Sequence, residues 1–298
     1  MPATTMLKSK FQIFVENMVL SFLTIIKIFV LSKFCLPKIK CSNKSNDCII
    51  LGNGPSLNDT IANNKDFLTD KDLFAVNFFA RTSNYSVLKP RHYVITSPQY
   101  WAENFNDVNT EGRKDVFEKI LKQTTWDIIL HVPALAKKKT TWEKKMLQNK
   151  HISISYFNTT PVDGIKFLNH WFFKLNLGMP RPHNVLIPSI KISIDLKYKK
   201  VFLFGADHSW LKDIFVTDDN VVLLTQKHFY DKNKAKPNVM HVGSTYRQRT
   251  LAEVLTKFVY AFNSYFVLKD YAKENNVKIF NATKGSYIDA FDRYSLPN

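Results

Sequence analysis

The chain has 298 residues, 45% of them hydrophobic, so it carries enough apolar side chains to bury a large core and is not an intrinsically disordered protein. Its formal charge of +17 predicts a positive surface that attracts phosphates, anionic lipid headgroups or acidic glycans. The lysines are spread along the chain, and no basic helix or nucleic-acid motif concentrates them.

The N-terminal segment from Phe11 to Leu36 is strongly apolar but is interrupted by charges, among them Lys27. A central charge disfavours a membrane span, whereas the helical spacing of the apolar residues suits a helix lying in a membrane interface. Flanking lysines would meet anionic headgroups. We therefore expect residues 1–47 to form a membrane-associating helix and linker, and keep a single-span anchor and a packing helix as alternatives.

The three cysteines, Cys35, Cys41 and Cys48, show neither zinc-ligand spacing nor an even-numbered disulfide framework. This pattern favours a reducing compartment. No small-residue cleavage site follows the apolar segment, so a removed signal peptide is not expected. Together with the apolar segment, these features predict a location on the cytoplasmic side of the inner membrane, peripheral or single-span.

Residues 48–298 alternate between short β-rich runs and helical periodicity. This alternation predicts an α/β fold, a Rossmann-like, doubly wound and mainly parallel sheet, in a single catalytic domain. The predicted strands are Ile49–Leu51, Leu73–Val76, Tyr93–Thr96, Ile128–Val132, Ile152–Phe157, Val201–Phe204 and Val277–Phe280. The predicted helices include Val116–Lys122, Trp142–Leu147, Gly164–Phe173, Ile190–Leu196 and Thr250–Asn275.

The first predicted strand runs directly into the turn Gly52-Asn53-Gly54-Pro55-Ser56-Leu57. Gly52 and Gly54 allow a close approach of the backbone to a ligand, and Ser56 is placed to cap the helix that follows. Free amides at a helix N-terminus attract phosphate. We therefore interpret this turn as a nucleotide pocket; a tight strand-to-helix turn without a ligand is the alternative.

Ligands of doubly wound sheets bind beyond the carboxyl ends of the strands, so polar residues at those positions are candidates for binding. Asn77 follows the second strand and is either a ligand contact or an Asx turn. Asp207 and His208 follow the strand that ends at Phe204, where Asp207 would accept hydrogen bonds from ligand hydroxyls and His208 would exchange a proton. Ser189, at a predicted helix start, would line the donor sugar.

Two further histidines fall near a polar, lysine-rich segment at about 212–240, which we interpret as a lid over the site. His241 is the first candidate for the base that deprotonates an acceptor hydroxyl, and His228 is the second. No histidine pair or nearby cysteine fixes a metal geometry, and Asp70-Lys71-Asp72 precedes its strand, so a metal-independent site is expected. Near the C-terminus, Asn281-Ala282-Thr283-Lys284 follows the last strand, where Asn281 would bind a ribose or base.

In motif order from Cys48 to the C-terminus the chain resembles the bacterial sialyltransferases of glycosyltransferase family 42. It also resembles a related pterin pyrophosphokinase-like family of unknown-function proteins, which shares the Gly-x-Gly-Pro-Ser-Leu turn and the Asn-Ala-Thr ending. The resemblance implies a flexible lid, a histidine base, and a metal-independent, inverting transfer at a membrane surface. The sialyltransferases have a histidine after the glycine that matches Gly243, where this chain has Ser244, so His241 is the expected substitute.

The sequence therefore predicts a glycosyltransferase that moves a sugar from a nucleotide donor, with CMP-sialic acid or a related acidic sugar as the first candidate, onto a surface glycan or glycolipid. The nucleotide sugar is a substrate, and no separate cofactor, metal or nucleic-acid partner is expected. Two alternatives stay open. One is a pterin-type diphosphotransferase that uses ATP and Mg²⁺. The other is a basic, membrane-attached nucleotide or nucleic-acid binder without catalytic activity.

Overall fold

The computed structural model describes residues 9–37, 43–97, 100, 110–138, 140–231, 235–242 and 247–296. Within these residues, eight strands form one sheet in which every neighbouring pair is parallel. The sheet order is β11-β10-β6-β1-β2-β3-β4-β5. The strands are β1 (Asp47–Leu51), β2 (Asp72–Val76), β3 (His92–Val94), β4 (Ile128–Pro133), β5 (Ile152–Phe157), β6 (Lys200–Phe204), β10 (Lys278–Asn281) and β11 (Asp292–Arg293).

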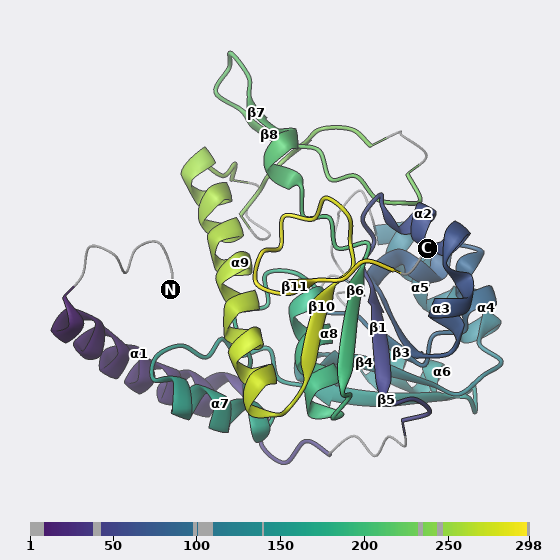
Figure 1. Cartoon of the computed structure of the whole chain (residues 1–298), viewed down its shortest axis with the longest axis horizontal. Coiled ribbons are helices and arrows are strands. Elements are labelled where there is room, and N and C mark those ends of the chain that lie inside the picture. Colours follow the sequence, from purple (N-terminus) through teal and green to yellow (C-terminus); the bar gives the residue numbers. More distant parts are fainter. Residues whose placement is uncertain are drawn as a thin grey trace.

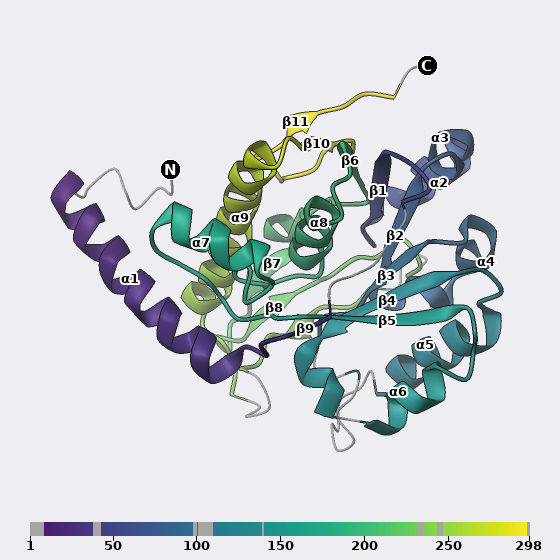
Figure 2. The ribbon, with the colours of Figure 1, turned by 90° about the horizontal axis from the view of Figure 1, so that it is seen from below.

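Helices cover both faces of this sheet, so the predicted doubly wound α/β fold is confirmed (Figures 1 and 2). One face packs against α7 (Lys166–Lys174), α8 (Leu186–Asp195) and α9 (Leu251–Glu274). The other packs against α2 (Leu57–Asn63), α3 (Lys65–Thr69), α4 (Asn84–Leu88), α5 (Thr110–Gln123) and α6 (Thr140–Met146).

Each central strand is buried on both faces and reads as a continuous apolar run. In β1, Cys48 and Ile50 join the core under α8 and α9, while Ile49 and Leu51 join the core on the opposite face. This alternation follows from the two-residue period of a strand. Strands buried on both sides are typical of parallel sheets covered by helices. Such strands appear in the sequence as short runs of β-branched and aromatic residues, so these runs predict them.

The order in which the chain adds strands to the sheet changes direction between the parallel neighbours β1 and β6. From β1 the chain proceeds outward through β2, β3, β4 and β5, and it then returns to add β6, β10 and β11 on the other side of β1. Loops leaving the carboxyl ends of β1 and β6 therefore diverge and leave a crevice, which is where ligands of doubly wound sheets bind.

The predicted lid segment contains a small antiparallel sheet of its own. Its strands are β7 (Ile214–Val216), β8 (Val222–Leu224) and β9 (Asn238–Val239), in that order. The β7–β8 hairpin projects from the body of the molecule at the top of Figure 1. Sequence patterning did not reveal these strands, because each is only two or three residues long.

The predicted apolar N-terminal helix is present as α1 (Lys10–Leu31), and Ser9 and Gln12 form a capping box at its start. It is one helix that by length and composition is apolar enough to cross a membrane. It lies at the edge of the molecule, beside α7 (Figures 1 and 2).

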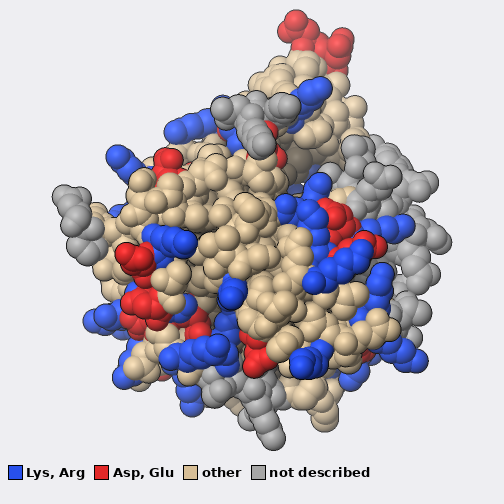
Figure 3. Space-filling model, turned by 90° about the vertical axis from the view of Figure 1, so that its right-hand side faces the viewer, with Lys and Arg blue, Asp and Glu red and all other residues tan. Residues whose placement is uncertain are grey.

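The charged side chains follow the even distribution seen in the sequence. On the face shown in Figure 3, lysines and arginines are scattered among acidic residues and do not gather into one large patch. A dispersed positive surface of this kind gives long-range attraction to anions without defining a nucleic-acid track on that face.

A buried polar network runs through the middle of the sheet. The His92 imidazole contacts His131 Nε2 at 3.0 Å and the Tyr198 hydroxyl at 2.9 Å, and Tyr198 donates to Asp72 at 2.8 Å. Both histidines are fully buried. Burial lowers the pKa of His131 to about 3 and holds the pKa of His92 well below its usual range, so both imidazoles are neutral at physiological pH.

We expect the free energy of unfolding to decrease as the pH falls below about 6.5. The unfolded chain protonates His131 at its ordinary pKa, whereas the folded imidazole stays neutral down to about pH 3. The stability from this group is thus complete above about pH 6.5 and is lost on acidification, with about 2 kcal/mol lost between pH 7 and pH 5. Urea denaturation at both pH values measures it. A His131→Gln variant should lose less over this range; an equal loss would contradict the assignment.

Candidate functional site

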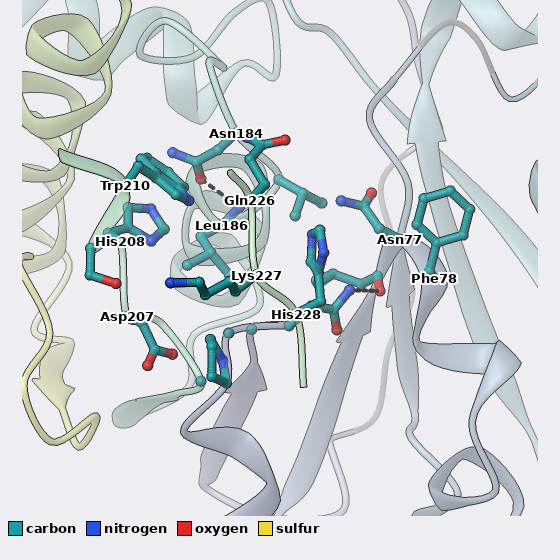
Figure 4. Close-up of a pocket in the computed structure, with 18 of the residues that line it drawn as sticks. Asn77, Phe78, Asn184, Leu186, Asp207, His208, Trp210, Gln226, Lys227 and His228 are labelled. Atoms are coloured by element: carbon teal, nitrogen blue, oxygen red, sulfur yellow. Dashed lines mark hydrogen bonds between the residues drawn. The ribbon is translucent and has the colours of Figure 1, made fainter. Parts of the chain in front are cut away.

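A cavity of about 340 Å³ opens at the crevice between β1 and β6. Figure 4 shows His208 and Trp210 on one side, Asn77 and Phe78 on the opposite side, and Lys227 and His228 between them. The lining comes from the loops after β1, β2 and β6, the start of α8 and the segment after β8. Five separate stretches of sequence thus meet at the carboxyl edge of the sheet.

The glycines after β1 serve backbone packing. The Gly52 amide donates to the Phe204 carbonyl at 2.7 Å, and the Gly54 amide donates to the Gly205 carbonyl at 2.8 Å. A Cβ atom at Gly52 would collide with the Gly205 carbonyl, and one at Gly205 would collide with the Gly52 carbonyl. Gly205 also has φ +61°, a conformation that favours glycine. The glycines line the cavity, but this close approach of two chain segments already explains them.

Asp207 occupies the position at which a phosphate was expected. Its carboxylate accepts hydrogen bonds from the Ser56 amide at 3.3 Å and from the Ser56 hydroxyl at 2.9 Å. Ser56 therefore makes no side-chain cap on α2, and the prediction that it caps this helix is wrong. The predicted phosphate site at this helix start is also not supported, because the half-buried Asp207 carboxylate already uses the Ser56 amide and would repel another anion. Burial raises the pKa of Asp207, and the Ser56 bonds oppose that shift.

Two asparagines predicted as ligand contacts do line the cavity. The Asn53 amide nitrogen donates to the Val76 carbonyl at 3.1 Å and so ties the β1 loop to the end of β2. Asn77 has φ +48°, a left-handed conformation that asparagine tolerates better than most residues. Its side-chain oxygen is buried and has no hydrogen-bond partner. A buried acceptor of this kind is free to receive a donor from a ligand.

His208 lines the cavity as a neutral side chain. The Tyr265 hydroxyl donates to Asn184 Oδ1 at 3.1 Å and lies 2.5 Å from His208 Nε2, so it accepts the His208 proton. Burial lowers the pKa of His208 to about 3. The expectation that this histidine exchanges a proton near neutral pH is therefore wrong. Its ring packs against Trp210 with the centroids 4.1 Å apart, so its role in the cavity is to shape one wall.

His228 has the arrangement that a general base requires. Its Nδ1 lies 3.1 Å from Asp231 Oδ2, and the same oxygen accepts the His228 backbone amide at 2.7 Å. The imidazole stacks on Tyr230 with the ring planes 6° apart. A carboxylate that holds Nδ1–H leaves Nε2 as the basic nitrogen, which is how histidine bases are oriented in acid–base sites. Its side chain lines the cavity.

The neighbouring Phe229 anchors this part of the lid segment to the domain. Its ring is buried and packs against Phe79, its amide donates to the Asn53 carbonyl at 3.0 Å, and its carbonyl accepts from Asn58 at 2.7 Å. The segment carrying His228 is thus fixed to the loop after β1. A freely opening lid does not describe residues 226–231.

Four predicted site residues do not line the cavity: Ser56, which binds Asp207, and Ser189, Asn281 and His241. Ser189 is fully buried inside α8, which begins at Leu186, four residues before the predicted start at Ile190, and its hydroxyl donates to the Val185 carbonyl. Asn281 is buried, and its amide bonds to Thr283, Ser286 and Ile288 close the turn after β10. His241 is exposed in a β-bridge with Gln248. Gly243 and Ser244 lie outside the described residues.

Sequence reasoning missed several lining residues, namely Asn184, Leu186, Trp210, Gln226, Lys227 and Tyr230. Asn184 carries the clearest signal in the sequence, because it lies just before the apolar run of α8. Its side-chain oxygen accepts a hydrogen bond from the Leu186 N–H at 2.9 Å. Its buried Nδ2 has no partner. Gln226 and Lys227 lie in the segment predicted as a lid, but the sequence did not show which residues of that segment line the cavity.

The charged groups of the cavity are largely paired with each other. The Lys227 ammonium lies 2.6 Å from the Asp213 carboxylate, and Asp207 is held by Ser56. Among the described residues, no group of three or more His, Cys, Asp or Glu side chains is arranged to hold a metal ion. Apart from these groups, the lining side chains are mainly amides, aromatic rings and His228.

Neither a family model nor a curated protein matches the chain. Among solved structures it is similar to the MAf glycosyltransferase from Magnetospirillum magneticum AMB-1, with a TM-score of 0.47 and 11% sequence identity. The match covers 95% of this chain and 38% of that one, so the chain spans well under half of the length of that protein.

We expect Asp207→Ala to lower the free energy of unfolding by about 1–3 kcal/mol, because the Ser56 amide and the Ser56 hydroxyl both lose their acceptor. Urea denaturation measures the change. Asp218→Ala, at an exposed position between β7 and β8, is the matched control and should leave stability within about 0.5 kcal/mol of the original chain. Equal stability of the two variants would show that the Asp207–Ser56 contact does not stabilise the fold.

Proposed function

We propose that the chain is a glycosyltransferase that transfers a sugar from a nucleotide donor to a hydroxyl of a glycan or glycolipid. The observation that carries the proposal is the cavity at the β1/β6 switch point, where a histidine–aspartate pair meets unpartnered amide groups. The motif resemblance to sialyltransferases supports the same reaction class. It also makes a CMP-linked acidic sugar the first donor to test.

The cavity has the chemistry to bind a nucleoside and a sugar. Asn77 Oδ1 is a buried acceptor without a partner, and Asn184 Nδ2 is a buried donor without one, on opposite sides of the opening. Such groups satisfy the hydroxyl and amide edges of a nucleoside. Phe78 and Trp210 supply flat apolar surface on which a base can stack. Lys227 provides positive charge for the phosphate once the ligand competes with Asp213.

The proposed reaction needs one base and one leaving group. The acceptor hydroxyl gives its proton to Nε2 of His228 while its oxygen forms the new bond to the anomeric carbon. The bond from that carbon to the donor phosphate breaks, and the nucleotide leaves with the electron pair. Asp231 holds the imidazole in the required tautomer and stabilises the imidazolium that forms. This assignment gives His228, not His241, the role of base.

Calorimetric titration with CMP, UDP, GDP and ADP tests ligand recognition first. We expect one nucleotide to bind with a dissociation constant below roughly 1 mM, and Asn77→Ala to weaken that binding at least about fivefold through loss of one hydrogen-bond acceptor. Asn281→Ala would perturb a structural turn, so it is not a suitable control. Gln148→Ala, at an exposed surface position, is the control and should bind normally. Absence of heat with every nucleotide would contradict the proposal.

His228→Ala should lower kcat roughly a hundredfold or more with the accepted donor, because the general base is lost. His241→Ala should leave kcat within about twofold, because His241 does not line the cavity. Asp231→Asn should lower kcat less than His228→Ala, with an altered pH profile that a purely structural role would not produce. Turnover assays with the nucleotide identified above measure all three. Full activity of His228→Ala would remove it from the mechanism.

The diphosphotransferase alternative is less well supported by the cavity. ATP-dependent transfer requires carboxylates that hold Mg²⁺ against the phosphates. Of the described lining residues, the acidic ones are Asp207 and Asp213, and both already bind other side chains. Activity that persists in a strong chelator would exclude this alternative. Steeply salt-dependent RNA or DNA binding without any sugar-nucleotide turnover would favour the non-catalytic alternative.

A further inference from the structure

Helix α1 presents an unusually large apolar surface to solvent. Between Phe11 and Phe34, thirteen large hydrophobic side chains are exposed, and Phe11, Phe29 and Val30 are each more than 70% exposed. Soluble monomers rarely expose contiguous apolar patches beyond a few hundred Å², and larger patches mark partner or membrane contacts. The mean hydropathy of 2.0 over an 18-residue window of α1 is in the range of segments that enter lipid.

The opposite face of α1 is polar and is bound to the domain. Ser21, Thr24, Ile28 and Ser32 are its buried residues, and their spacing of three and four places them on one helical stripe. Thr24 donates to the Asp163 carbonyl at 2.8 Å and accepts the Asp163 amide at 3.0 Å.

Further contacts extend this docking along the second half of the helix. Ser21 accepts the Ile165 amide at 2.8 Å. The Ser32 hydroxyl donates to the Leu177 carbonyl at 2.5 Å and lies 2.7 Å from the Thr160 hydroxyl, which can donate to it. Just beyond the helix, Asn158 bonds both the amide and the carbonyl of Lys33 at 2.8 Å. The side of α1 that faces the domain is therefore fixed over about three helical turns.

Helix α7 extends the apolar surface. Its N-cap residue Ile165 is the one that contacts Ser21, and α7 lies beside α1 in both ribbon views. Phe167 is 75% exposed and Trp171 is 50% exposed, at positions four residues apart and hence on one face of α7. Tryptophan side chains are enriched at membrane interfaces because the ring is apolar and the indole N–H remains hydrated.

Basic residues border this surface. Lys10 begins α1, Lys33 follows it, and Lys174 ends α7, all exposed, while Lys166 pairs with Asp270. An apolar face with lysines at its edges matches an anionic bilayer surface, where the side chains enter the acyl region and the ammonium groups meet headgroups. A second copy of this chain would place the same lysines opposite each other.

We propose that the exposed faces of α1 and α7 form one membrane-binding surface, with α1 lying parallel to a single leaflet and not crossing it. The hydrogen bonds between α1 and the domain are the evidence for this orientation. A spanning α1 would take Ser21, Thr24 and their backbone partners near Asp163 into the hydrocarbon, together with the Lys27–Asp163 ion pair at 3.7 Å. This inference does not depend on the proposed function.

Vesicle flotation of the full chain tests the surface. With mixed phosphatidylcholine–phosphatidylglycerol vesicles, Phe167→Ser/Trp171→Ser should weaken binding at least about tenfold, since two large side chains no longer leave water. Val87→Ser/Leu147→Ser replaces two exposed apolar residues away from α1 and α7, and should bind like the original chain. Circular dichroism confirms folding of both. Equal binding of the two double variants would overturn the role of α7.

Thiol labelling tests the orientation. Two proteins with one reactive cysteine each are prepared: one keeps native Cys35 and carries Cys41→Ser, and the other carries Lys10→Cys with Cys35→Ser and Cys41→Ser. Each is added to preformed vesicles and treated with a membrane-impermeant maleimide. Both ends of α1 should label from the outside. Protection of Lys10→Cys with labelling of Cys35 would show a spanning helix and overturn the proposal. Self-association without vesicle binding, measured by sedimentation, would overturn it in favour of a second copy of the chain.

Discussion

The contact between the backbones of Gly52 and Gly205 is the constraint on which the site depends. The strands β1 and β6 are adjacent, and the loops that follow them diverge. Where these loops begin, their backbones approach so closely that neither Gly52 nor Gly205 has room for a Cβ atom. The hydrogen bonds from Gly52 to Phe204 and from Gly54 to Gly205 continue the β1–β6 pairing into the loops. They fix the floor of the crevice, so its walls are supplied by side chains further along each loop.

Asp207 then determines what that crevice can bind. Because its carboxylate uses the Ser56 amide and hydroxyl, the start of α2 offers no site for a phosphate, although the sequence there has every feature of one. The cavity instead offers one unpartnered atom on each of two side-chain amides, Asn77 Oδ1 and Asn184 Nδ2, and the ammonium of Lys227, which is paired with Asp213. A cavity of this kind selects a ligand by its hydrogen-bonding pattern, and its net charge contributes less.

The fold was predictable because its strands are buried on both faces, so that each appears as an uninterrupted apolar run between polar turns. The site was predictable in part. Asn53 and Asn77 follow strands directly, and their place at the carboxyl edge follows from topology alone. Asn281 occupies an equivalent place, but its side chain forms hydrogen bonds within the local turn. No sequence pattern distinguishes an asparagine that closes a turn from one that lines a cavity. His228 lines the cavity and His241 is exposed at the surface. No local pattern predicts this difference, because it depends on long-range packing.

Phe229 links that packing to the chemistry. Phe229, the residue next to His228, is buried against Phe79 and bonded through its backbone to the loop after β1, so His228, the cavity floor and the turn with Asn53 are joined by direct contacts. A base held on a rigid element keeps its distance to a bound hydroxyl without an ordering step on each turnover. The β7–β8 hairpin is held at its base, where Val222 and Leu224 are buried against Val254 and Phe258 of α9, while Phe215 and Val216 are exposed and the hairpin projects from the body of the molecule (Figure 1). The predicted lid therefore divides into two parts with different supports: residues 226–231, which carry His228, are fixed to the loop after β1, and the hairpin is attached to α9.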